Sequence, residues 1–437
     1  MTRVLDPSRV RFPAGHEAQP FIHYRHLLYA YHAARARGLP DEAFVRLVED
    51  LDRRVAQVDG HGFAVTPFFR SEGLSAHLGF APGGGVWVKD ETGNVSGSHK
   101  ARHLMGLLIL LDVAERTGAA PWTADARPPL AIASCGNAAL AAAVVARAGG
   151  WPLEVFIPTW AEPQVVARLE ALGARLVVCP RTDGVPGDPT YRRLKEALAA
   201  GALPFTCQGP DNGLTIEGGM TLGYEMVSAL AASGRALDRV FLQVGGGALA
   251  SSTIQAYQDA RRLDALAALP RVHAVQTRGG HPLARAYDLV RRRLLEAIER
   301  EFGARPAPGD GPQAQADLIR VHADSRAVQE ALHYAATHRS EFMWPWEEEP
   351  KSVASGILDD ETYDWLAIVK GMVATGGFPV VVSEETLEEA NALAQAATGI
   401  DVDHTGSAGL AGLLDLHRQG AVGPNENVAV LFTGIKR

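Results

Sequence analysis

Lys100 is the first residue whose surroundings point to covalent chemistry. It ends the stretch Asn94-Val95-Ser96-Gly97-Ser98-His99-Lys100, between a β-like run at Val86–Lys89 and a helical pattern. A lysine amine in water is protonated and a poor nucleophile, but one placed at the end of a small, glycine-containing turn can condense with an aldehyde. A lone lysine would more often cap a helix or face solvent. The whole stretch favours the chemical interpretation.

A second candidate site is the run Gly245-Gly246-Gly247, which follows an apolar segment and precedes a helical pattern. Glycine turns let successive backbone N–H groups surround a phosphate. Neither a G-x-G-x-x-G fingerprint nor the Gly-Lys-Ser/Thr ending of a nucleotide-binding loop is present. The alternative is that the glycine run binds no phosphate and is an ordinary turn between a strand and a helix. An aldehyde site and a phosphate site together suggest the cofactor pyridoxal 5'-phosphate.

A third candidate is Ser134-Cys135-Gly136-Asn137, which connects a strand-like run to an alanine-rich helix. Backbone N–H groups at the start of a helix point toward an anion and are favoured by the helix dipole. We therefore expect this loop to bind a carboxylate. The alternative is that Ser134 and Asn137 only cap the helix.

The bulk composition narrows the class of protein. The chain has 437 residues, 47% hydrophobic and 21% charged, which predicts a globular protein of two domains. A net charge of −8 offers no basic surface for nucleic acid. The three cysteines fit no metal spacing and suggest a reducing compartment. No signal peptide and no run of about 18 apolar residues is present, so we expect a cytoplasmic protein without membrane or metal.

The hydrophobic pattern predicts an α/β fold with parallel sheets. Short β-branched runs alternate with helical stretches, as in strands that are buried on both faces. Residues 1–65 have a helical pattern, at Tyr24–Tyr29 and Phe44–Val55, and residues 303–313 are a Pro/Gly-rich loop. The expected strands are Val86–Lys89, Pro129–Ala133, Leu153–Ile157, Arg175–Cys179, Arg239–Val244, Arg271–Gln276, Phe378–Val382 and Val428–Phe432.

Taken together, these motifs resemble one family. The stretch 94–100 is similar to the N-P-T-G-S-F-K segment of the fold-type II, tryptophan synthase β-like pyridoxal-phosphate enzymes, with a histidine as in the G-S-H-K of tryptophan synthase β chains. The loop 134–137 resembles their S-x-G-N loop, and Thr433-Gly434 matches the ending of threonine synthases. The resemblance covers roughly residues 60–437 and is nearest to threonine synthase and serine/threonine dehydratase.

The resemblance implies a role for each matched residue. Lys100 would hold the cofactor and act as the catalytic base, and Cys135, where Ser or Thr is usual, could act as an acid or base. A neutral hydroxyl at Thr433 would face the pyridine nitrogen, which favours elimination over transamination. Cofactor binding is expected at Lys100, His99, Asn137, Gly245, Gly246, Gly247, Ala248, Leu249 and Thr433. Substrate binding is expected at Ser134, Cys135, Gly136, Asn137, Ser96 and Ser355.

The resemblance also implies an architecture: two parallel-sheet α/β domains with the cofactor in the cleft between them, plus a helical N-terminal extension. The expected boundaries are residues 1–60 for the extension, 61–100 with 208–437 for the larger cofactor domain, and 101–207 for the smaller domain that carries the carboxylate loop. A homodimer is a family expectation.

The reaction stays open at the level of the sequence. We expect a lyase that removes the α-proton of a small amino acid and eliminates a β- or γ-group, either deaminating, as serine/threonine ammonia-lyases do, or with replacement, as threonine synthase does. A phosphorylated substrate would need a second anion site, for which Arg102, His103 and Lys436 are the candidates. The alternatives are a β-replacement synthase that uses a thiol or another nucleophile, an inactive cofactor-binding regulatory protein, and a nucleotide-binding α/β protein.

Overall fold

The computed structural model describes residues 6–181 and 187–436, which form two compact units. The first unit comprises the chain up to Thr66, Gly93–Ser228 and Arg262–Ala265, and the second comprises Pro67–Thr92, Ala229–Arg261 and Leu266 onward. Each unit is built around its own sheet, and nearly all the neighbouring strands in both sheets are parallel. The α/β fold with parallel sheets and a helical N-terminal region is confirmed.

The sheet of the first unit has the order β5-β4-β3-β6, and all its strands are parallel. Ala131, Phe156, Cys179 and Leu194 form part of its buried core. The strands are β3 (Leu130–Ala133), β4 (Leu153–Pro158), β5 (Arg175–Cys179) and β6 (Leu203–Pro204), and the helices along them are α5 (Lys100–Arg116), α6 (Asn137–Gly149), α7 (Pro163–Ala171), α8 (Pro189–Ala199) and α9 (Thr215–Ser233), whose last turn belongs to the second unit.

The N-terminal helices belong to the first unit and are more broken than the sequence pattern predicts. The helical pattern at 24–29 is interrupted, because Leu28 is extended between a 3₁₀ turn and α2, which begins at Tyr29. The carboxylate of Glu217 on α9 accepts the Tyr29 N–H at 2.7 and 2.8 Å, so it caps the new helix from outside. The observed helices are α1 (Pro20–His23), a 3₁₀ turn at Arg25–Leu27, α2 (Tyr29–Ala36) and α3 (Asp41–Asp59).

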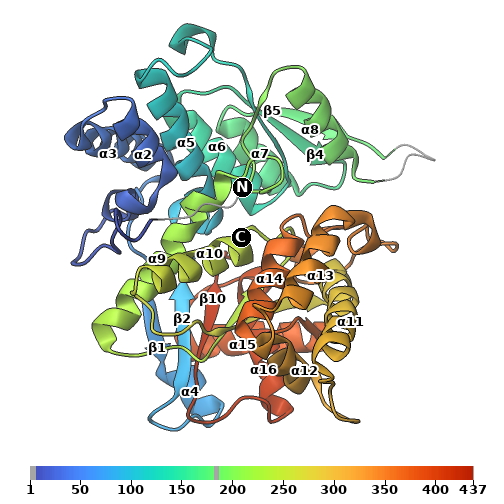
Figure 1. Cartoon of the computed structure of the whole chain (residues 1–437). Coiled ribbons are helices and arrows are strands. Elements are labelled where there is room, and N and C mark those ends of the chain that lie inside the picture. The colour runs from blue at the N-terminus through green and yellow to red at the C-terminus, as the bar shows by residue number, and fades with distance from the viewer. Residues whose placement is uncertain (1–5, 182–186, 437) are drawn as a thin grey trace. The chain divides into compact units, whose positions relative to one another are not determined.

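The sheet of the second unit has the order β1-β2-β10-β7-β8-β9, with only β1 antiparallel to its neighbour. Strands from opposite ends of the chain, β2 in light blue and β10 in red, lie side by side (Figure 1). Helix α16 packs against β7, β8, β9 and β10. The strands are β1 (Phe68–Ser71), β2 (Gly85–Asp90), β7 (Arg239–Gln243), β8 (Arg271–Thr277), β9 (Val380–Val382) and β10 (Asn427–Phe432).

The helices of the second unit pack apolar residues against this sheet. In α14 (Trp365–Thr375), for example, Ile368, Val369 and Met372 are buried. No helix in the described ranges has the length and apolar character that crossing a bilayer requires. The helices are α4 (Glu72–His77), α10 (Ala248–Arg262), α11 (Pro282–Phe302), α12 (Pro312–Val321), α13 (Arg326–Thr337), α14 (Trp365–Thr375), α15 (Glu384–Thr398) and α16 (His404–Arg418).

Candidate active site

Lys100 is the first residue of α5 and follows a tight turn in the first unit. The turn contains two consecutive residues with positive φ, Ser96 at 57° and Gly97 at 65°. Glycine adopts this conformation readily, whereas a serine there costs about 1–2 kcal/mol. The backbone N–H of Ser96 donates to Asp59 Oδ2 at 2.9 Å, and the Asn94 side chain donates to the Ser98 carbonyl at 3.2 Å. The last residue of α3 therefore holds the turn that positions the lysine.

The histidines that flank the first turn of α5 contact each other edge to face, with the His99 and His103 ring centroids 5.9 Å apart. Burial, followed by the positive charge of Lys100, lowers the pKa of His103 to about 3. His103 is therefore neutral, and its Nδ1–H donates to the Thr215 carbonyl at 2.9 Å. A cation next to Lys100 would help to keep that amine unprotonated, but this histidine does not supply one.

The loop Ser134–Gly136 joins β3 to α6 in the same unit. The Ser134 N–H donates to the Phe156 carbonyl at 3.2 Å, which fixes the start of the loop. Gly136 has φ −130°, and a Cβ added to it would meet no atom of residues 6–181 or 187–436 within 4 Å, its two chain neighbours aside. Neither backbone strain nor packing requires a glycine there. The small residue leaves open space at the amino end of α6, beside Asn137.

Contacts within the first unit bring these two segments together. Helix α6 packs on α5 and on the turn Val95–Gly97. Lys100, His99, Ser96 and the loop 134–137 thus belong to one compact unit. The roles of these residues stay predictions.

The triple-glycine run lies in the second unit, between β7 and α10. A segment after the 3₁₀ turn at Ser355–Ile357 holds it: Thr362 Oγ1 donates to the Gly245 carbonyl at 2.9 Å, and the Asp364 N–H donates to the Gly246 carbonyl at 3.0 Å. A Cβ at Gly245 would lie 2.2 Å from Asp359 Oδ2, and Gly247 has φ +105°. Close approach and conformation both require glycine in this run.

Two other predicted residues lie in the same unit as the glycine run. The 3₁₀ turn that contains Ser355 is held by the Gly356 N–H, which donates to Thr405 Oγ1 on α16 at 3.0 Å. Thr433 directly follows β10 and accepts a hydrogen bond of 2.6 Å from Gln243 Nε2, the last side chain of β7. Because β10 pairs with β7, the hydroxyl and the glycine run lie at the carboxyl ends of neighbouring parallel strands. Gln243 was not among the residues that the sequence indicated.

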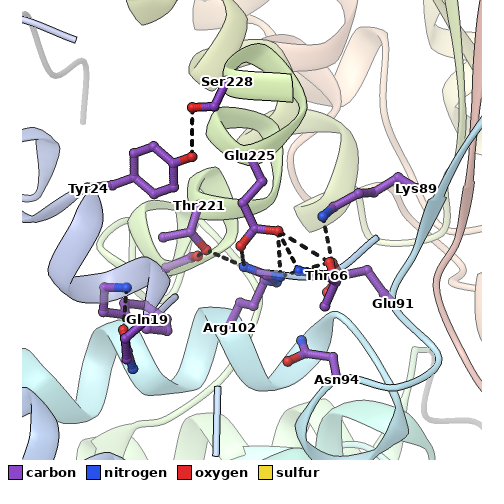
Figure 2. A network of polar contacts seen from close by, with 12 residues as sticks. Gln19, Tyr24, Thr66, Lys89, Glu91, Asn94, Arg102, Thr221, Glu225 and Ser228 are labelled. Atoms are coloured by element: carbon purple, nitrogen blue, oxygen red, sulfur yellow. Dashed lines mark hydrogen bonds and ion pairs between the residues drawn. The ribbon is translucent and has the colours of Figure 1, made fainter. Parts of the chain in front are cut away.

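A buried network in the first unit was also missed from the sequence. Arg102 is fully buried, and its guanidinium contacts Glu225 Oε1 at 2.6 Å and Oε2 at 3.0 Å. Nη1 also donates to Thr221 Oγ1 and Nη2 to Thr66 Oγ1 (Figure 2). The guanidinium is satisfied by the chain itself. The prediction that Arg102 could bind the phosphate of a substrate is therefore wrong, because no ligand could reach the guanidinium without breaking its ion pair with Glu225.

The residues present fit pyridoxal 5'-phosphate in each unit taken by itself. Ser98 is fully buried, and its Oγ has no hydrogen-bond partner in the described part of the chain, two residues before Lys100. A buried polar atom of this kind is usually satisfied by a ligand or water. In the second unit, the glycine run at the start of the 15-residue helix α10 offers the N–H groups that a phosphate requires. The negative charge of the Asp359 carboxylate, which lies beside Gly245, would repel a phosphate bound there.

Comparisons with known proteins identify relatives of the chain. The family model described as "Pyridoxal-phosphate dependent enzyme" matches residues 61–434. A cysteate synthase from Methanoculleus marisnigri is 26% identical over 316 residues, 70% of this chain and 60% of that protein, so the chain spans less than two thirds of this relative. A threonine synthase from Methanocaldococcus jannaschii is 22% identical over 84% of this chain and 74% of its own length. The solved diaminopropionate ammonia lyase from Escherichia coli shares the fold, with a TM-score of 0.60 at 15% identity, covering 90% of this chain and 89% of that one.

Proposed function

Because the chain belongs to the family of pyridoxal-phosphate dependent enzymes, we propose that it removes the α-proton of a small amino acid and expels a group from the β- or γ-carbon. The observation that carries this proposal is the neutral Thr433 hydroxyl, held by the Gln243 amide at the end of β10. A hydroxyl beside the pyridine nitrogen leaves that nitrogen unprotonated, whereas a carboxylate would stabilise its protonated form. The weaker electron sink favours rapid loss of a leaving group over transamination.

The chain's own residues divide the remaining work. Pyridoxal 5'-phosphate, when bound, supplies an electron-withdrawing ring conjugated to the substrate nitrogen. The Lys100 amine takes the α-proton at Nζ, as a general base. The Ser134 side chain and the backbone N–H groups of Cys135 and Gly136 hold the substrate carboxylate in the open space beside Gly136. Asn137 and Ser96 orient the ring and substrate from the same unit, and the N–H groups of residues 245–249 hold the phosphate.

The proposed leaving group is uncharged. A phosphorylated substrate would need a second cation, but Arg102 is neutralised by Glu225 and the His103 side chain is neutral. Lys436, the third candidate for a second anion site, is exposed near the C-terminal end of the given sequence. The hydroxyl of serine or threonine needs only a proton on departure, as water. The Cys135 thiol is the proposed donor of that proton, and the product is a keto acid and ammonia.

A second candidate is replacement by an incoming nucleophile. It rests on the names of the curated relatives, a cysteate synthase and a threonine synthase, which form a new amino acid instead of a keto acid. Elimination and replacement share the proton-abstraction step at Lys100. The two differ only in whether water or another nucleophile intercepts the product of elimination.

The test is a screen of the cofactor-loaded protein with serine, threonine, diaminopropionate, O-acetylserine and O-phosphohomoserine. Keto acid from one of the first three supports deamination, and a new amino acid formed only with added thiol or sulfite supports replacement. Lys100→Ala should lower the rate by about a thousandfold or more and abolish covalent attachment of the cofactor. Lys370→Ala, which removes an exposed lysine of α14, is the matched control. Full activity of Lys100→Ala would refute the proposal.

A further inference from the structure

A long loop of the second unit, residues 342–364, lies against the glycine run. It joins the 3₁₀ turn Arg339–Glu341 to α14 and contains one further short turn, at Ser355–Ile357. Loops of this length with so little regular structure are uncommon in compact proteins and usually serve a function. We call this loop the strap. Its last residues contact the run, because a Cβ added to Gly246 would lie 2.9 Å from the Tyr363 ring.

The start of the glycine run is fixed separately, by the buried side chain of Gln276 on β8. Its Nε2 donates at 3.2 Å to the carbonyl of Val244, the residue before Gly245, and its Oε1 accepts the Ala284 N–H at 3.0 Å. Ala284 lies in the first turn of α11. This helix and the glycine run are therefore joined through one side chain, and Arg285 is the next residue of the helix.

The Arg285 side chain attaches the strap to α11. Its Cζ lies 3.9 Å from the ring centroid of Trp344 and 5.2 Å from that of Trp346. It also donates to the Glu347 carboxylate at 2.7 and 2.9 Å and to the Trp344 carbonyl. A planar guanidinium can stack on an indole and bind a carboxylate at the same time, which an ammonium cannot. The Trp346 ring packs in turn on His281, with the ring centroids 4.5 Å apart.

A backbone hydrogen bond joins the two parts of the strap. The Trp346 N–H donates to the Asp360 carbonyl at 2.9 Å. The part of the strap that Arg285 holds is thus bonded directly to the part that lies against the glycine run. Because only 18% of the Arg285 side chain is exposed, its contacts are partly shielded from water and are stronger than those of a surface pair.

The second part of the strap orients the amide groups of the glycine run. Thr362 Oγ1 donates to the Gly245 carbonyl, and the Asp364 N–H donates to the Gly246 carbonyl. Each carbonyl shares a planar trans peptide group with the N–H of the following residue, so its direction sets the direction of that N–H. The strap therefore fixes where the N–H groups of Gly246 and Gly247 point. Glycine has little conformational preference of its own to do so.

We propose that Arg285 is a positioning residue for the phosphate turn. By holding the strap against α11, it keeps the N–H groups of Gly246 and Gly247 directed at the phosphate of the bound cofactor. The inference rests on the proposed function, and it adds a residue that acts on the phosphate only through the strap. Loss of Arg285 should therefore weaken binding of the phosphate and leave binding of the pyridine ring unchanged.

The experiment compares two ligands on the full-length apoprotein: pyridoxal 5'-phosphate, and pyridoxal, which lacks the phosphate. The dissociation constant of pyridoxal divided by that of pyridoxal 5'-phosphate, here called the phosphate ratio, measures what the phosphate contributes. Arg285→Met removes the charge and keeps the length of the side chain. It should weaken binding of pyridoxal 5'-phosphate about fivefold, the equivalent of about 1 kcal/mol for a lost cation–π contact. Binding of pyridoxal should change by less than about twofold.

Two further variants of α11 separate positioning from a general structural role. Arg293→Met is the matched control, because Arg293 Cζ lies 3.5 Å from the Tyr334 ring centroid and, among the described residues, has no hydrogen bond to the strap. Its phosphate ratio should equal that of wild type. Arg285→Lys keeps the charge and should recover part of the ratio. A fall of equal size for both ligands in Arg285→Met, or an unchanged phosphate ratio, would overturn the inference.

A change on the strap itself keeps the test decisive if Arg285→Met does not fold. Trp344→Leu removes the ring on which the guanidinium stacks, so it should also lower the phosphate ratio and move the ³¹P resonance of the bound cofactor. A ratio and a resonance at their wild-type values would contradict the inference. Combined with Arg285→Met, it should lower the ratio by less than the product of the two separate effects, since the two residues act through one contact.

The wild-type protein distinguishes failure of this inference from failure of the proposed function. A phosphate ratio near one in the wild type would overturn both, because the glycine run would then bind no phosphate. A ratio well above one that survives Arg285→Met would overturn only the role of Arg285. None of these measurements needs turnover. A chain that shows the expected ratios yet converts no amino acid would refute only the proposed reaction.

Discussion

Arg102 of α5 and Glu225 of α9 form a two-pronged ion pair that is completely buried, with their side chains 0% and 1% exposed. Thr66 and Thr221 complete the donors and acceptors around it. The two helices approach so closely that a Cβ at Gly218 would lie 2.0 Å from the Arg102 carbonyl oxygen. This arrangement fixes the first turn of the helix that begins with Lys100.

The first prediction concerns the stability of that pair. Arg102→Met should lower the free energy of unfolding by about 3–5 kcal/mol, because Glu225 would be left as a buried charge without its counter-ion. The double variant Arg102→Met/Glu225→Leu should recover much of the loss. Urea unfolding measures both. Arg326→Met, which breaks an exposed pair with Glu330 on α13, should leave stability unchanged. A loss below about 1 kcal/mol for Arg102→Met would contradict the prediction.

The second prediction concerns pH. Burial lowers the pKa of His103 and of His273 to about 3, whereas in the unfolded chain both titrate near 6.5. The unfolded state therefore binds more protons between these values. Each histidine contributes stability that is complete above about pH 6.5 and is lost, by about 1.4 kcal/mol per pH unit, as the pH falls toward 3.

His103→Gln tests this without assuming the behaviour of other groups. The difference in free energy of unfolding between wild type and variant should shrink by about 1.4 kcal/mol for each pH unit between about pH 6 and 4. Urea titrations at several pH values give the curves. Curves for the two proteins that stay parallel over this interval would show that the buried histidine is not the cause.

The third prediction separates function from stability at Gly136. Since a Cβ there meets no atom within 4 Å in the described part of the chain beyond its two neighbours, and φ is −130°, Gly136→Ala should unfold at the same urea concentration as wild type. The methyl group would instead occupy the space proposed for the substrate carboxylate. We expect kcat/KM to fall about 10- to 100-fold, the cost of weakening a charge-assisted hydrogen bond. Gly218→Ala is the contrasting variant, because it should destabilise the fold. Unchanged kcat/KM in Gly136→Ala would place the carboxylate elsewhere.

The fourth prediction concerns the glycine run. Gly245→Ala places a Cβ 2.2 Å from Asp359 Oδ2 and 2.8 Å from the Ile357 Cα, so backbone must move. We expect a loss of about 1–3 kcal/mol in stability and weaker binding of pyridoxal 5'-phosphate. Cofactor titration and thermal unfolding provide the measurements. Gly311→Ala, at a site with open space and φ −74°, should change neither. Wild-type cofactor affinity in Gly245→Ala would argue against phosphate binding at this run.

Much of the fold follows from local signals. The strand Arg175–Cys179 has the predicted bounds, and Arg239–Val244 and Val428–Phe432 are displaced by one residue at one end, because short β-branched runs between helical stretches have few alternatives. The helical pattern at 24–29 does not reveal the break at Leu28, because the start of α2 at Tyr29 is capped by a carboxylate 188 positions away, that of Glu217. No local pattern contains that information.

The sequence alone determined the family and its cofactor. The lysine at the end of its turn, the glycine run and Thr433 are short motifs, each set by its own residues, and the family match over residues 61–434 agrees with the cofactor that they predict. Only the tertiary structure decided which polar side chains are already satisfied. Arg102 resembles an anion ligand in sequence, but folding gives it Glu225. Gln243 resembles an ordinary strand residue, but strand pairing brings it to Thr433. Hydrogen bonds between distant residues depend on which strands and helices become neighbours, and that is a property of the packed chain.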